Sequence, residues 1–351
     1  MRPRHKIGLA GLLAISVAAA FFAWLGVFNV AASTGHWSVT NRLLHFAMRA
    51  SVRVYALSVT VPDLRKTGLL QASAVHFQAG CAYCHGAPGV SPSPAALSML
   101  PPPPGLSNKI SEWTDAQLFR IVRHGVRYTG MPAWPAPDRD DEVWGMVAFL
   151  RELPSLDGEH YRELVAGPAT SEAGEVSGFD ADLARCAQCH GADGVGRSED
   201  VPVIAGQSGA YLLASLKAYL EGRRRSGVMQ VAVSQTNEDT FEALAQYYAG
   251  RPEPAKPVGD TASIARGREI AERGLPRKGV PACLGCHGGS RKNPAYPRIA
   301  GQKKLYLETQ LRLFAAGRRG GTAYSSIMAK VAATLDDTDI ADVTAYFTSA
   351  R

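Results

Sequence analysis

The sequence predicts an all-α protein in which three small helical domains follow one amino-terminal transmembrane helix. Three observations predict this fold class. An uncharged stretch runs from Ile7 to Ser33, and one five-residue cysteine pattern occurs three times further along the chain. No segment sustains the alternation of apolar and polar residues that marks a strand. Segments of helical periodicity are instead joined by loops rich in glycine and proline, as in small all-α domains.

Residues 1–33 are predicted to form a short cytoplasmic tip and a membrane anchor. Three basic residues, Arg2, Arg4 and Lys6, precede an uncharged stretch longer than the roughly 20 residues that a spanning helix needs. Because basic residues stay on the cytoplasmic side, we expect a single pass through the inner membrane, with everything after about residue 33 in the periplasm. The alternative is a cleavable signal peptide that ends near Ala31-Ala32-Ser33, although such signals have shorter apolar cores of about 7–15 residues.

Residues 34–66 are predicted to contain an amphipathic helix next to the membrane. Apolar and small residues recur there at helical spacing with arginines between them. The first set is Leu43, Leu44, Ala47, Met48 and Ser51, and the arginines are Arg42, Arg49 and Arg53. Packing of this helix against the first domain is an equally good interpretation of the pattern.

The three predicted domains cover residues 67–154, 179–250 and 262–351. Between them, residues 155–178 and 251–261 have the acidic, small or proline-rich composition of linkers. The second and third domains are a duplication offset by about 95 residues, because PVIAGQ at 202–207 matches PRIAGQ at 297–302. The first domain is more distant from both.

The recurring pattern is Cys-x-x-Cys-His, and it contains every cysteine of the chain. The three copies are Cys81, Cys84 and His85; Cys186, Cys189 and His190; and Cys283, Cys286 and His287. This spacing is the attachment signature of c-type haem, in which two thiols bond the haem edge and the histidine binds the iron. A redox dithiol or half a zinc site is the alternative for a single copy, but three copies on an exported chain predict three covalently bound haems.

A methionine follows each motif at a similar distance and precedes the closing helix of the same domain. Met131 follows His85 by 46 residues, Met229 follows His190 by 39, and Met328 follows His287 by 41. A single methionine is usually a core residue, but three in the same relative place predict the sixth iron ligands. In the first domain His124 is the rival ligand. Ligation by histidine and methionine closes the iron to small molecules and favours electron transfer.

Two further sets of residues are predicted to support the haems. The ring Nδ1–H of an iron-binding histidine commonly donates to a backbone carbonyl, and Pro202, Pro297 and one of the prolines at 101–104 are placed to stiffen the loops beside these rings. Arg223 and Arg318 can pair with buried haem propionates, which need compensating charge. The alternative is that these arginines are solvated at a helix end.

These residues resemble a known family. Each domain resembles a class I cytochrome c, with its amino-terminal Cys-x-x-Cys-His, its methionine and its closing helix with aromatic residues. Residues 180–351 resemble the dihaem cytochromes c4, including the repeated Pro-x-Ile-Ala-Gly-Gln and Gly-Arg elements. Residues 25–154, with Gly130-Met131-Pro132-Ala133-Trp134, resemble membrane-anchored monohaem cytochromes. The resemblance implies three cytochrome c folds, with the paired haems of the c4-like part facing each other through their propionates.

Charge and motifs limit the possible partners. The net charge of +7 arises mostly at the carboxyl end, where residues 261–351 hold 15 Lys and Arg against 7 Asp and Glu. No nucleic-acid motif accompanies this charge. The better interpretation is that it balances cofactor carboxylates or steers an acidic protein partner. No catalytic residue is predicted, and no nicotinamide or flavin fingerprint occurs.

The sequence therefore predicts an electron carrier, without enzymatic activity of its own, that takes electrons from a dehydrogenase or quinol-oxidising complex and passes them to a terminal oxidase or soluble cytochrome. The alternative is a cytochrome subunit of a stable membrane-bound dehydrogenase or respiratory complex. A third possibility, a dihaem peroxidase, requires an open iron, and the three methionines argue against it.

Overall fold

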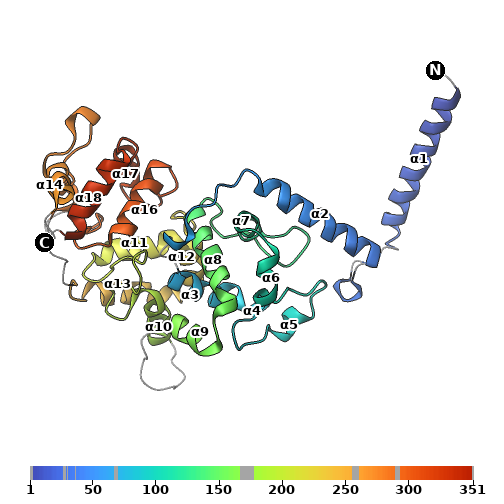
Figure 1. The fold of residues 1–351 in the computed structure, drawn as a ribbon, viewed down its shortest axis with the longest axis horizontal. Coiled ribbons are helices and arrows are strands. Elements are labelled where there is room, and N and C mark those ends of the chain that lie inside the picture. Colours follow the sequence, from blue (N-terminus) through green and yellow to red (C-terminus); the bar gives the residue numbers. More distant parts are fainter. Residues whose placement is uncertain are drawn as a thin grey trace.

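The structure, a computed structural model, describes residues 3–26, 29, 31–35, 37–66, 70–166, 178–254, 261–288 and 293–349. Within these ranges the chain forms helices, turns and two isolated β-bridges, and no strand. The predicted all-α class is therefore confirmed. Figure 1 shows the helical units following one another along the molecule, with helix α1 projecting away from the rest at the amino-terminal end.

Helix α1 spans Pro3–Trp24 and is followed, after a short 3₁₀ turn at Ala32–Thr34, by α2 at Ser38–Ala56. Of the helices in the described ranges, none is both long and apolar enough to cross a membrane, so the predicted transmembrane anchor is not confirmed. The carboxyl-terminal half of α2 packs on the first domain, where the Arg49 guanidinium lies 4.5 Å from the centre of the Trp113 ring. Leu43, in the amino-terminal half of the same helix, is exposed.

The first domain is built around α3 (Leu70–Gly80) and α8 (Asp140–Glu152), with α7 (Asp115–His124) packed beside α8. Phe77 of α3 and Phe149 of α8 are fully buried, with ring centres 5.3 Å apart. Phe119 of α7 stacks on Trp144 of α8 at 4.2 Å. Short helices α4 (Ala82–His85), α5 (Pro94–Leu97) and α6 (Leu106–Lys109) complete the domain.

The beginning of the linker predicted at 155–178 is part of the first domain. Helix α9 spans Gly158–Val165, capped by Asp157, whose carboxylate accepts hydrogen bonds from two backbone N–H groups. Tyr161 of α9 is buried against Phe77, and its hydroxyl donates to Gln78 at 2.8 Å. Only two apolar residues of this segment, Tyr161 and Val165, are buried, which is too short a pattern to distinguish from a linker. Residues 167–177 and 255–260 of the two predicted linkers lie outside the described residues.

The second domain consists of α10 (Phe179–His190), α11 (Gly209–Leu220), α12 (Gly227–Ser234) and α13 (Phe241–Ala249). The third repeats the plan with α14 (Ala262–Arg273), α15 (Leu284–His287), α16 (Lys304–Ala315), α17 (Ser325–Ala332) and α18 (Asp337–Ser349). Helices α14 and α18 cross closely, because a Cβ atom on Gly267 would lie 2.0 Å from the carbonyl oxygen of Asp342. Glycine is therefore required at this crossing.

Candidate cofactor sites

All three Cys-x-x-Cys-His motifs fold as one helical turn. In the first, the backbone N–H groups of Cys84 and His85 both donate to the carbonyl of Cys81, each at 3.0 Å. The third motif repeats the pattern around Cys283, and the second forms the last turn of α10. None of the six cysteines forms a disulfide. Because two thiols and one imidazole share a single turn, each motif can present them together to one group.

Each motif histidine is held by a proline carbonyl. The Nδ1 atoms of His85, His190 and His287 lie 2.9, 3.4 and 2.8 Å from the carbonyl oxygens of Pro104, Pro202 and Pro297, respectively. A carbonyl oxygen only accepts, so each ring carries its proton on Nδ1 and leaves Nε2 as a free lone pair. The prediction that these loops meet the rings is confirmed, and among the four prolines at 101–104 the structure selects Pro104. Burial lowers the pKa of His190 to about 4, which keeps its ring neutral.

One continuous cavity of about 1120 Å³ joins the second and third domains. It is lined by both of their motifs and by both of their methionines: Cys186, Cys189, His190, Met229, Cys283, Cys286, His287 and Met328. Ligand pockets typically enclose about 300–1,000 Å³, so this cavity exceeds the space for one ordinary ligand. Apolar side chains, including Leu212 and Leu307, line much of its wall. Burial raises the pKa of the Cys189 thiol to about 12. The residues therefore fit two large apolar groups that attach through paired thiols.

Comparisons with known proteins agree with this arrangement. Residues 68–150 match the family described as cytochrome c oxidase, cbb3-type, subunit III, and residues 179–247 and 264–351 match the family described as cytochrome c. Cytochrome c4 of Pseudomonas aeruginosa is 31% identical over 177 residues, which are 50% of this chain and 88% of that protein. The chain is a class I c-type cytochrome.

Two other similarities accompany these matches. The thiosulfate dehydrogenase electron acceptor of Thiomonas intermedia is 35% identical to this cytochrome over 150 residues, which are 40% of this chain and 67% of that protein. Among solved structures, reduced recombinant cytochrome c4 from Pseudomonas stutzeri is 28% identical, with a TM-score of 0.46, and the match covers 50% of this chain and 100% of that one. The sequence match to the Thiomonas protein relates the cytochrome to electron carriers.

The first motif of the cytochrome lies apart from the shared cavity. Cys81, Cys84, His85 and Met131 do not line it. Burial nevertheless raises the pKa of the Cys81 thiol to about 12. The loop that carries Met131 is tied back to α7, since the N–H of Trp134 donates to the carbonyl of Arg123 in that helix at 3.1 Å. The rival ligand His124 is exposed, and its Nε2 accepts from Arg120 at 2.8 Å.

The arginines that face the cavity are the neighbours of those expected from the sequence. Arg223 is exposed and pairs with Glu221, and Arg318 is partly exposed and pairs with Asp140 at 3.0 Å. The buried side chains that line the cavity are instead Arg224 and Arg319. Both Gly-Arg pairs are followed by a second arginine. The second arginine in each repeat was the available signal in the sequence. Only packing decides which of the two neighbouring arginines points into the cavity.

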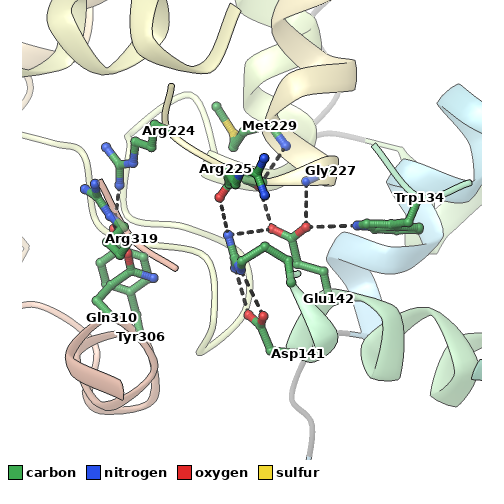
Figure 2. Close-up of polar contacts among 12 residues, drawn as sticks. Trp134, Asp141, Glu142, Arg224, Arg225, Gly227, Met229, Tyr306, Gln310 and Arg319 are labelled. Carbon is green, nitrogen blue, oxygen red and sulfur yellow. Dashed lines mark hydrogen bonds and ion pairs between the residues drawn. The ribbon is translucent and has the colours of Figure 1, made fainter. Parts of the chain in front are cut away.

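Arg224 and Arg319 have no carboxylate partner among the described residues. Arg224 donates to the hydroxyl of Tyr306 at 3.3 Å (Figure 2). It also donates to the hydroxyl of Ser215 at 2.8 Å, and its Nε has no hydrogen-bond partner in the described part of the chain. Arg319 donates to Gln310 at 2.9 Å. Although burial alone would raise the pKa of Tyr211, the two guanidinium groups lower it to about 8. Buried positive charge needs compensation, so this part of the cavity is suited to an anionic group such as a carboxylate.

Proposed function

We propose that this cytochrome carries three covalent haem groups and acts as an electron relay. The six motif cysteines would attach the haems, and His85, His190 and His287 would bind the irons on one side. Met131, Met229 and Met328 would bind on the other side. The observation that carries the proposal is the cavity that brings two complete sets of these residues together, Cys186, Cys189, His190 and Met229 with the corresponding set of the third domain.

A bound haem supplies a one-electron iron couple, with a potential that depends on axial ligands, hydrogen bonds and burial. The residues of this chain would determine the axial ligands, the hydrogen bonds and the burial of each haem. The proline carbonyls orient the histidine rings, the apolar walls exclude water, and Arg224 and Arg319 offer positive charge to the propionates. Because the second and third motifs share one cavity, electrons can pass between their cofactors within the protein.

We also propose that α1 attaches the cytochrome to the inner membrane, with the haem domains in the periplasm. Support comes from the uncharged stretch that follows Lys6 and from the exposed apolar side chains of α1, including Leu13, Ile15 and Phe22. Fractionation of cells that produce the full chain tests this proposal. Extraction of the cytochrome by salt alone, without detergent, would contradict it.

The proposed partners are redox proteins. The relative from Thiomonas intermedia is an electron acceptor of thiosulfate dehydrogenase, and we propose that this cytochrome likewise receives electrons from a dehydrogenase or quinol-oxidising complex and delivers them to a terminal oxidase or soluble cytochrome. The alternative, a permanent subunit of such a complex, predicts that a flavin, quinone or molybdenum centre co-purifies with the cytochrome.

Carbon monoxide and cysteine variants test the haem proposal. We expect three haems per chain, and two in each double variant C81A/C84A, C186A/C189A and C283A/C286A. With six-coordinate irons, carbon monoxide should cause no prompt change in the visible spectrum of the anaerobically reduced protein. A prompt change in about a third of the haem would mean that one iron is open, and Met131 would then be the first assignment to reject.

A further inference from the structure

The first domain forms part of the wall around the second cofactor site. Ala72, Val75 and His76 of α3 line the same cavity as Met229 of α12. Helix α3 packs against α12, and Val228, the residue before Met229, packs on the hydrophobic core of the first domain. The helix that carries the proposed iron ligand is therefore held from outside its own domain.

Glu142 of α8 is the polar centre of this contact (Figure 2). Its side chain is buried, and it accepts hydrogen bonds from the Ser226 hydroxyl at 2.5 Å and from the backbone N–H of Gly227 at 2.7 Å. Trp134 donates its indole N–H to the same carboxylate at 3.2 Å, and Arg139 forms an ion pair with it at 3.0 Å. Burial raises the pKa of Glu142, but all four partners donate, which favours the ionised form.

Two of these partners form the amino-terminal end of α12. Ser226 is the residue that caps this helix, and its hydroxyl also accepts the backbone N–H of Met229 at 3.1 Å. A chain of hydrogen bonds therefore runs from Glu142 through Ser226 to Met229. A carboxylate at this end of a helix also interacts favourably with the helix dipole.

We propose that Glu142 is a positioning residue that fixes the first turn of α12 and thereby holds Met229 against the second haem iron. This inference rests on the proposed function, because it takes Met229 as an iron ligand. The first domain would then influence both the axial ligation and the reduction potential of the haem that is attached to the second domain.

The third domain provides an internal comparison. Its corresponding helix α17 begins at Ser325, and the residue before it, Tyr324, makes no capping hydrogen bond with its side chain. Within the described part of the chain, the Glu142 carboxylate is bound by Arg139, Trp134, Ser226 and Gly227, none of which belongs to α17. Removal of Glu142 should therefore affect one of the haems and leave that of the third domain unchanged.

The test uses the full-length holoprotein with the variants E142A, E142Q, S226A and M229A. Three readouts are followed: the sulfur-to-iron charge-transfer band of the oxidised protein, carbon monoxide binding by the reduced protein, and the three reduction potentials. D115N is the control, because Asp115 pairs with Arg151 inside the first domain at 2.6 Å, away from α12.

We expect E142A to weaken the charge-transfer band and to lower one of the three reduction potentials. Carbon monoxide should bind to as many as one haem in three in the reduced variant. E142Q keeps an acceptor oxygen and should fall between E142A and the wild type, whereas D115N should match the wild type. If E142A does not fold, S226A tests the proposal in its place. S226A should show the same changes to a smaller degree.

The outcomes separate the two proposals. M229A should remove the same fraction of the charge-transfer band. If M229A changes nothing, the assignment of Met229 as a ligand is wrong and the proposed function fails at that site. If M229A removes the band while E142A and S226A behave like D115N, the assignment of Met229 stands and the role of Glu142 is overturned.

Discussion

Gln207 and Gln302 occupy equivalent positions in the duplicated PxIAGQ segments, and each binds the backbone of the other copy. Gln207 donates to the carbonyl of Arg298 at 2.8 Å and accepts the N–H of the same residue at 2.6 Å. Gln302 does the same with Val203, at 2.9 and 2.8 Å. Both side chains are buried. The duplication thus produces a pair of domains that recognise each other with approximate twofold symmetry.

Replacement of either glutamine by alanine should loosen this pair of domains. Q207A would leave the N–H and C=O groups of Arg298 without their partner, and a buried unsatisfied group costs about 1–3 kcal/mol. We expect a loss of that size in the free energy of unfolding, measured by denaturant titration. Q246A, which removes an exposed glutamine of the same domain, is the control. Equal stability of Q207A and Q246A would contradict the prediction.

Arg224 should raise the potential of an adjacent haem. A buried positive charge favours the reduced state of the iron, because reduction adds an electron nearby. We expect R224Q to lower at least one of the three potentials by tens of millivolts, as measured by spectroelectrochemical titration. R223Q removes the neighbouring arginine, which is 53% exposed, and should change none of them. Identical titrations for R224Q and R223Q would show that no haem propionate lies beside Arg224.

Asp342 should stabilise the third domain in a pH-dependent manner. Its carboxylate on α18 accepts from Arg266 of α14 at 2.5 and 2.8 Å and from Ser263 at 2.5 Å. These contacts, with the hydrogen bond from Arg266 first, lower the pKa of Asp342 below its ordinary value of 3.8. The stabilisation is therefore present above the unfolded-state pKa and is lost as the pH falls through the folded-state pKa.

We accordingly expect D342N to lower the free energy of unfolding at pH 7 by about 1.5–3 kcal/mol, the usual scale for hydrogen bonds to a charged group. The difference from the wild type should shrink as the pH falls below the ordinary pKa of aspartate. Thermal unfolding at a series of pH values measures both effects. A difference that stays constant down to the acid limit would argue against an ionised Asp342 in the contact.

Gly227 should be irreplaceable at the contact between the first two domains. A Cβ atom there would lie 2.2 Å from Nε1 of Trp134, so G227A must displace the indole or the start of α12. Overpacking of this kind costs about 1–3 kcal/mol, and we expect a lower unfolding temperature. G320A is the matched control, because nothing lies within 4 Å of the added methyl. Comparable unfolding temperatures for the two variants would mean that the contact is looser than described.

The sequence by itself determined the features that depend on neighbouring residues. The Cys-x-x-Cys-His turn needs only five residues, so all three attachment motifs can be located from the order of residues alone. The all-α class follows from helical periodicity, and the duplication of the second and third domains follows from direct repetition. The expectation that proline loops meet the histidine rings is also confirmed, although the choice of Pro104 from four neighbouring prolines required the tertiary structure.

Only the tertiary structure decided which side chains meet across domains. The sequence pointed to Arg223 and Arg318, but the next arginine in each repeat is the buried one, since a shift of one residue turns a side chain to another face. Glu142 resembles an ordinary acidic residue in the first turn of a helix, yet it binds Ser226, 84 residues away. Such contacts leave no local period in the sequence, because they depend on how whole domains pack against one another.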